Sequence, residues 1–329
     1  MMLHAPVMAL LLTAWLGAAT LLWAAAFATT LLRHWNLASG ARRQIELERR
    51  THLVATLLTL VMLAQAVALP LMVFNADRTA PLLVGAMCAF GSFNASVYGF
   101  PALYAKLALF FAAVVWLALH HADLRAPDYP LTRRKYILLL ALLPLALADA
   151  GLTTAYFADL KADTLTSCCG SAFNPEHAGV AAEAAALNPQ LALGLLAAAL
   201  AATLGVGALA GRWPRAAVVY GGASLAFLGV ALLAVVAAIS LYVYEHPHHH
   251  CPFCLLKREY GYFGFLLYTP LFAGTACGVA SGVLSWRLPA SLQVHGRQVA
   301  QRLRRLSLGG FVLFGLLAAA AVWQSALRL

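Results

Sequence analysis

Eight apolar stretches of about 20 residues or more constrain this chain more than any other feature of its sequence. A helix needs about 20 apolar residues to cross a bilayer core, and a helix satisfies its own backbone polar groups, as lipid requires. The predicted spans are residues 6–32, 52–74, 97–119, 136–158, 191–210, 216–242, 262–284 and 308–326. The sequence therefore predicts an all-α, polytopic membrane helical bundle of about eight transmembrane helices, which is a single membrane domain over residues 1–329 in contact with the lipid bilayer.

Charge is scarce and unevenly distributed along the chain. Only 10% of the residues are charged, compared with about 25% in soluble proteins. Sixteen of the 22 basic residues fall in alternate connections between the spans, namely Arg33, Arg42, Arg43, Arg49, Arg50, Arg125, Arg133, Arg134, Lys135, Arg212, Arg215, Arg287, Arg297, Arg302, Arg304 and Arg305. Cytoplasmic loops are enriched in Lys and Arg, so this side is predicted to be cytoplasmic and both termini exterior. The same asymmetry explains the net charge of +10, and no nucleic-acid partner is expected.

The composition of the spans suggests the host membrane. Ala and Leu dominate them, and Arg outnumbers Lys, a pattern that favours a GC-rich bacterial genome. We therefore expect a multi-pass protein of the bacterial inner membrane, whose exterior loops face the periplasm. Residues 81–96 are also apolar, but Gly85, Gly91 and Asn94 interrupt them. We expect a short re-entrant or interfacial segment there, because a further full span would place later Arg-rich loops outside.

Five of the six cysteines fall on the predicted exterior side, where disulfide chemistry is permitted. They are Cys88, Cys168, Cys169, Cys251 and Cys254, and the sixth, Cys277, lies within the seventh span. Cys168 and Cys169 are adjacent, and Cα atoms 3.8 Å apart are too close for an ordinary disulfide. Each is therefore expected to find a partner elsewhere, either by reaching Cys251 or Cys254 or by completing a metal site with them.

The strongest local motif is His246-Pro-His-His-His-Cys251-Pro-Phe-Cys254. In one interpretation Cys251 is an exchanging thiol and Cys254 the resolving thiol of a two-electron redox pair. In a second, the thiolates of Cys251 and Cys254 and the imidazoles of His248 and His250 bind zinc or copper. In a third, the cysteines form a structural disulfide that ties exterior loops together.

A short similarity indicates an internal repeat. Cys88-Ala-Phe-Gly is followed by Tyr98-Gly-Phe, and Cys251-Pro-Phe-Cys is followed by Tyr260-Gly-Tyr, in each case just before a span. Parallel repeats occur in membrane transporters. The hypothesis divides the chain into two parallel four-helix halves, residues 1–189 and 190–329, and it would bring Cys88 and Cys251 together on one central site.

Two ionisable residues are predicted to lie deep within the bilayer. Lys106 and Asp149 each stand about nine residues from the outer end of consecutive spans, or about 14 Å below the outer surface. Charges at that depth usually pair and often mark a functional path. We predict a Lys106–Asp149 ion pair that Gln65 can join, acting as a proton relay, as a quinone-headgroup site or as a clamp between helices.

The exterior cysteines above a helical bundle are similar in outline to membrane thiol oxidoreductases such as the vitamin K epoxide reductases and the quinone-linked disulfide oxidases. The resemblance covers only the Cys-x-x-Cys pair and its side of the membrane, and no residue role follows from it.

The cysteines, the histidines and the predicted topology together support three hypotheses about function. The leading one is a membrane thiol–disulfide oxidoreductase or electron-transfer protein that meets a thioredoxin-like exterior partner. In it, the pair of Cys251 and Cys254 exchanges with the partner, and Cys168, Cys169 or Cys88 passes electrons on. The second is Cu(I) or Zn(II) binding, transport or insertion with an exterior metal carrier. The third is a non-catalytic, disulfide-stapled subunit.

Overall fold

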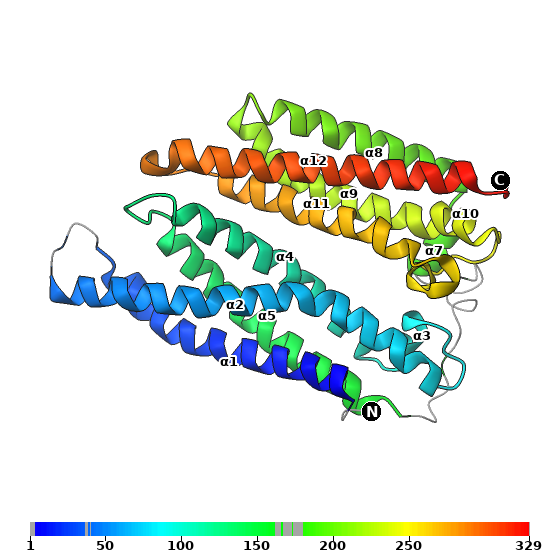
Figure 1. Cartoon of the computed structure of the whole chain (residues 1–329), viewed down its shortest axis with the longest axis horizontal. Helices are drawn as coiled ribbons and strands as arrows, with labels where there is room; N and C mark the ends of the chain where they lie inside the picture. The colour runs from blue at the N-terminus through cyan, green and yellow to red at the C-terminus, as the bar shows by residue number, and fades with distance from the viewer. Residues whose placement is uncertain are drawn as a thin grey trace. The chain divides into compact units, whose positions relative to one another are not determined.

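The computed structural model describes residues 4–36, 39, 41–161, 166, 173 and 180–328, and this part of the chain is helical with no β-strand. Eight of its helices are long and apolar enough to span a membrane, which confirms the predicted polytopic helical bundle (Figure 1). The α-helices are α1 (Ala5–His34), α2 (Arg42–Thr79), α3 (Ala89–Asn94), α4 (Gly99–Asp123), α5 (Thr132–Asp159), α7 (Val180–Ala186), α8 (Pro189–Leu209), α9 (Pro214–Ala234), α10 (Ser240–Tyr244), α11 (Phe263–Ser285) and α12 (Gln293–Gln324). Short helical turns are η1 (Ala80–Leu82), η2 (Val235–Ile239), η3 (Cys254–Leu256), η4 (Arg258–Tyr260) and η5 (Ala290–Leu292).

The chain divides into two compact units that are not simple sequence halves. The first unit contains residues 1–75, 96–161 and 287–299, and the second contains residues 76–95, 162–286 and 300–329. The ends of α2 and α12 therefore belong to a different unit from the rest of each helix. The repeat halves 1–189 and 190–329 stay a prediction.

In the first unit, α5 packs against both α1 and α4. Apolar side chains from its four long helices form one core, which includes Leu21, Leu58, Leu109 and Leu139. The outer faces stay apolar as well, since Leu16 is 64% exposed. Such a surface suits lipid rather than water, as the apolar spans predicted.

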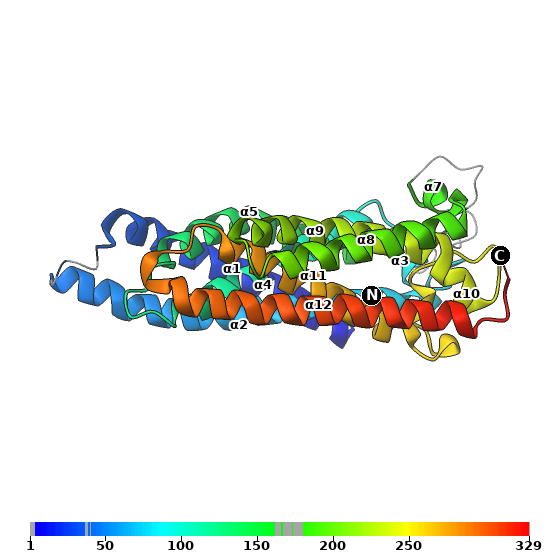
Figure 2. The same ribbon diagram turned by 90° about the horizontal axis from the view of Figure 1, so that it is seen from above.

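In the second unit, α9 lies between α8 and α11, and Figure 2 shows α8 and α9 side by side. The approach of α9 to α11 is close because glycines meet at the crossing. A side chain added at Gly282 would stand 2.8 Å from the Cα atom of Gly221. Small residues allow this kind of contact between membrane helices.

Residues 80–96 form a short irregular segment, as the interrupted apolar pattern predicted. All of them are described, and they hold only η1, the six-residue α3 and connecting turns. Gly85 has a φ of +88°, a conformation that favours glycine. A side chain at Gly85 would also collide with the carbonyl oxygen of Thr166. This segment positions Cys88.

Candidate functional site

Three buried cysteines meet in the second unit. Cys88 precedes α3, Cys254 begins η3, and Cys251 lies in the preceding loop. Their Sγ atoms all lie within 4.8 Å of one another, and the Sγ atoms of Cys88 and Cys251 are 3.5 Å apart. Cys88 and Cys251 are 0% exposed and Cys254 is 6% exposed. No disulfide joins any two of the three. We refer to Cys88, Cys251 and Cys254 as the thiol cluster.

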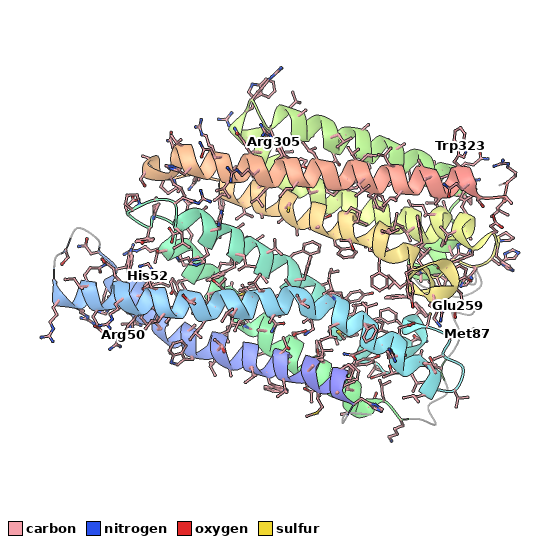
Figure 3. The ribbon with its side chains drawn as sticks, in the orientation of Figure 1. Arg50, His52, Met87, Glu259, Arg305 and Trp323 are labelled. Carbon is pink, nitrogen blue, oxygen red and sulfur yellow. The ribbon has the colours of Figure 1, made fainter. Side chains whose placement is uncertain are left out.

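Aromatic packing holds α3 against the Cys-Pro-Phe-Cys loop. The ring of Phe253, between the two cysteines of the motif, lies 5.7 Å from Phe93 and 6.4 Å from Phe90 in α3. The Lys257 ammonium donates a hydrogen bond to the carbonyl of Met87, the residue before Cys88. Figure 3 shows Met87 and Glu259 at the same end of this unit. Apolar and polar contacts therefore fix the two cysteine-bearing segments together.

Two tyrosines fix the backbone around Cys251. The Tyr244 hydroxyl donates to the carbonyl oxygen of Cys251 at 2.5 Å, and the Tyr268 hydroxyl donates to that of Pro252 at 2.7 Å. Buried carbonyl groups need such donors, since water cannot reach them. These bonds hold the loop in a defined conformation behind its thiols.

The histidines of the motif make other contacts. The Nδ1 atom of His250 lies 2.9 Å from the carbonyl oxygen of Val236, and because a carbonyl only accepts, Nδ1 carries the proton. Burial lowers the pKa of His250. The backbone nitrogen of His248 donates to Nδ1 of His246, and His249 stacks on Tyr244 with ring centroids 4.1 Å apart. The structure does not bring His248 or His250 into the group of ligand atoms that lie within 4.8 Å of one another.

The remaining cysteines do not add to the described cluster. Cys168 and Cys169 lie outside the described residues. Cys277 is half-buried in α11, within the seventh span as predicted. Cys88 and Cys251 meet, as the repeat hypothesis predicted.

The predicted ion pair is present in the first unit. The Nζ atom of Lys106 in α4 lies 2.6 Å from Oδ2 of Asp149 in α5, and both side chains are 0% exposed. The prediction of this pair is confirmed. The Gln65 amide donates to the carbonyl of Thr13 at 3.2 Å, and no hydrogen bond described here joins it to Lys106 or Asp149. The role of Lys106, Asp149 and Gln65 as a cofactor-binding or proton-relay site stays a proposal.

A second buried ion pair, which the sequence reasoning missed, joins the other ends of α4 and α5. The Lys135 ammonium lies 2.7 Å from Oδ2 of Asp123, and the two side chains are 2% and 0% exposed. Lys135 is one of the basic residues in a connection that the sequence predicts to be cytoplasmic. The signal in the sequence was Asp123 itself, an acidic residue at the edge of a strongly basic connection.

The distances between the three sulfur atoms suit coordination of one shared metal ion better than a disulfide bond between two of the cysteines. Thiolates at about 2.3 Å from one ion stand about 3.8–4.0 Å apart in tetrahedral or trigonal geometry, whereas a disulfide is about 2.05 Å long. The 3.5 Å between Cys88 and Cys251 is close to the first value. No known family model, no curated protein and no solved structure matches the chain. The thiol cluster is a group of side chains that could hold a metal ion.

Proposed function

We propose that this multi-pass membrane protein binds a thiophilic metal ion through the thiolates of Cys88, Cys251 and Cys254, and that it prefers Cu(I). The observation that carries the proposal is the approach of all three Sγ atoms to within 4.8 Å of one another at buried positions. A disulfide uses two sulfur atoms, and a metal ion uses all three at once. On the predicted topology this site faces the exterior, so an exterior metal carrier would supply or receive the ion.

The nature of the ligands favours Cu(I). Soft thiolate ligands select Cu(I) and Zn(II). Structural zinc sites take four ligands, whereas Cu(I) is satisfied by three thiolates. The described residues that converge on this point are three cysteines, so a zinc ion would need a further ligand.

A nearby cation supports the charge balance of such a site. Cu(I) bound to three thiolates has a net charge of −2, which is costly where water is excluded. The Lys257 ammonium is hydrogen-bonded to the carbonyl of Met87. Met87 is next in sequence to Cys88, and Lys257 itself follows Cys254 by three residues. The Lys257 ammonium therefore partly offsets that charge.

Metal titration of the whole chain in detergent tests the proposal. The purified protein is reduced, kept under argon and titrated with Cu(I) against a competing chelator, and the ligands are identified by X-ray absorption spectroscopy. We expect about one Cu(I) per chain with sulfur ligation, and a loss of affinity of at least about a hundredfold in Cys88→Ser and Cys251→Ser. Cys277→Ser is the matched control and should bind as the unmodified chain does. Binding that survives Cys88→Ser would refute the three-thiol site.

One observation favours thiol–disulfide exchange as a second candidate. The Sγ atom of Cys88 lies 3.5 Å from that of Cys251, within reach of a Cys251–Cys254 disulfide. The Cys88 thiolate would attack Sγ of Cys251, the Cys251–Cys254 bond would break, and Cys254 would leave as a thiolate. No net oxidation occurs until an exterior thioredoxin-like dithiol or disulfide supplies or accepts two electrons.

Access separates the two candidates. A partner's sulfur must reach the attacked sulfur directly, yet Cys88 and Cys251 are 0% exposed, so a small ion reaches the cluster more readily than a protein thiol. Incubation of the metal-free chain with an oxidised or reduced dithiol, followed by mass spectrometry of alkylated cysteines, tests exchange. A Cys88–Cys251 disulfide that forms and reverts within seconds would favour exchange over metal binding.

A further inference from the structure

The two buried ion pairs of the first unit differ in how completely they are hydrogen-bonded. Both join α4 to α5. The Asp123 carboxylate accepts three bonds, from the backbone nitrogen of Leu131 at 2.6 Å, from the hydroxyl of Thr132 at 3.0 Å and from the Lys135 ammonium at 2.7 Å. Both of its oxygens therefore have partners, as expected of a structural clamp at a helix end.

The Asp149 carboxylate is not saturated. Its Oδ2 atom accepts from Lys106 at 2.6 Å, while Oδ1 is buried and has no hydrogen-bond partner among the described residues. Thr153 lies one helical turn further along α5 and is close enough to act on the Asp149 carboxylate, but its buried hydroxyl oxygen makes no hydrogen bond of ordinary geometry with a described residue. Asp149, Lys106 and Thr153 are all 0% exposed. Unmade hydrogen bonds in a low-dielectric interior are costly, so a clamp alone does not account for this arrangement.

The helices of the first unit carry few other ionisable residues in the stretches around this pair. Between His4 and Arg33, α1 has no titratable side chain, and α2 has none between His52 and Asp77. On α4 the titratable residues besides Lys106 are Tyr104, His120, His121 and Asp123, and on α5 besides Asp149 they are Arg133, Arg134, Lys135, Tyr136, Tyr156 and Asp159. Tyr104 is 63% exposed, and Tyr156 follows Asp149 by two turns. Lys106 is the charged group that acts on Asp149.

We propose that Asp149, positioned by Lys106, is a proton-binding site inside the membrane, with Oδ1 as the atom that takes the proton and the Thr153 hydroxyl as its acceptor. A proton needs no cavity, and the adjacent ammonium disfavours a metal cation. On uptake, an O–H bond forms at Oδ1, Lys106 stays an ammonium group, and the charge of the pair changes from 0 to +1. Nothing is oxidised or reduced. The site belongs to the first unit and does not depend on the thiol cluster.

Infrared difference spectroscopy of the full chain in lipid nanodiscs, titrated with acid, tests the proposal. A protonated carboxylic acid has a carbonyl stretch that a carboxylate lacks. We expect a band that grows on acidification, disappears in Asp149→Asn and persists in the control Asp123→Asn. In Lys106→Gln the band should move to higher pH by about one unit or more, a tenfold or larger change in proton affinity, because the ammonium no longer favours the carboxylate. Lys135→Gln should leave the midpoint unchanged.

A second variant keeps the proposal testable if Asp149→Asn does not fold. Thr153→Val keeps the ion pair and removes only the proton's acceptor, so the band should remain but move to the frequency of an acid with a weaker hydrogen bond. The proposal would be overturned if neither Thr153→Val nor Lys106→Gln changed the frequency or the midpoint pH of the carbonyl band. It would also be overturned if the band persisted in Asp149→Asn.

Discussion

Replacing Asp123 by alanine should destabilise the first unit more than most single substitutions do. The change leaves the Lys135 ammonium buried without its counter-charge and also removes the acceptor of the Leu131 backbone nitrogen. Breaking a buried ion pair costs about 3–5 kcal/mol, and orphaning a buried donor costs about 1–3 kcal/mol. Because neighbouring effects do not add, we expect a decrease of about 4 kcal/mol in the free energy of unfolding.

The double variant Asp123→Ala/Lys135→Met separates the two contributions. It removes the buried charge but still leaves Leu131 and Thr132 without their acceptor, so about 1–3 kcal/mol of the loss should remain. Unfolding of each variant by denaturing detergent, followed by circular dichroism in the same mild detergent, measures the difference. If Asp123→Ala costs less than about 1 kcal/mol, or if the double variant is no more stable than the single one, the carboxylate is not the clamp that its three hydrogen bonds indicate.

Two further predictions concern the second unit. In Gly282→Ala the new Cβ atom would meet the α9 backbone at 2.8 Å, so thermal unfolding should show a loss of about 1–3 kcal/mol. Gly222→Ala, with nothing within 4 Å, should instead gain up to about 1 kcal/mol; equal effects would contradict the packing argument. Tyr244→Phe removes the donor to the Cys251 carbonyl and should weaken Cu(I) binding about 10–100-fold in a chelator competition. Tyr242→Phe is its control, because no contact described here joins Tyr242 to the thiol cluster. If Tyr244→Phe and Tyr242→Phe bind Cu(I) with the same affinity, the Tyr244 hydroxyl does not position the loop.

Hydropathy located the spans well and the helix ends poorly, for one physical reason. Apolar runs mark the length that lies in hydrocarbon, whereas a helix can continue into water through polar residues. The second predicted span, 52–74, lies inside α2, which begins at Arg42. There Arg50 and Glu46 form an ion pair at 2.7 Å one turn apart, a pattern that supports an exposed helix. The eighth span extends toward its N-terminus in the same way.

Contacts inside the bilayer were easier to predict than contacts in the loops. The Lys106–Asp149 pair followed from the depth of the two residues, because a lone charge in lipid has few alternatives to pairing. The loop that carries Cys251 and Cys254 is bounded by Glu245 and Tyr262, which have φ values of 51° and 56°. This conformation is uncommon for residues other than glycine, so the identities of Glu245 and Tyr262 do not indicate it. The contacts of His248 and His250 therefore could not be read from spacing.

The two proposed sites can be tested separately because each lies within one unit. The thiol cluster joins Cys88 to cysteines 163 or more residues later in the chain, so an ion bound there would cross-link two segments of the second unit and stabilise it by mass action. Asp149 belongs to the first unit, and its proton needs no metal. If Cys88→Ser abolishes Cu(I) binding but leaves the Asp149 carbonyl band unchanged, the two events are independent. If Cu(I) shifts that band in the unmodified chain and not in Cys88→Ser, protonation and metal binding are thermodynamically linked, and by reciprocity acid must shift the Cu(I) affinity by the same factor.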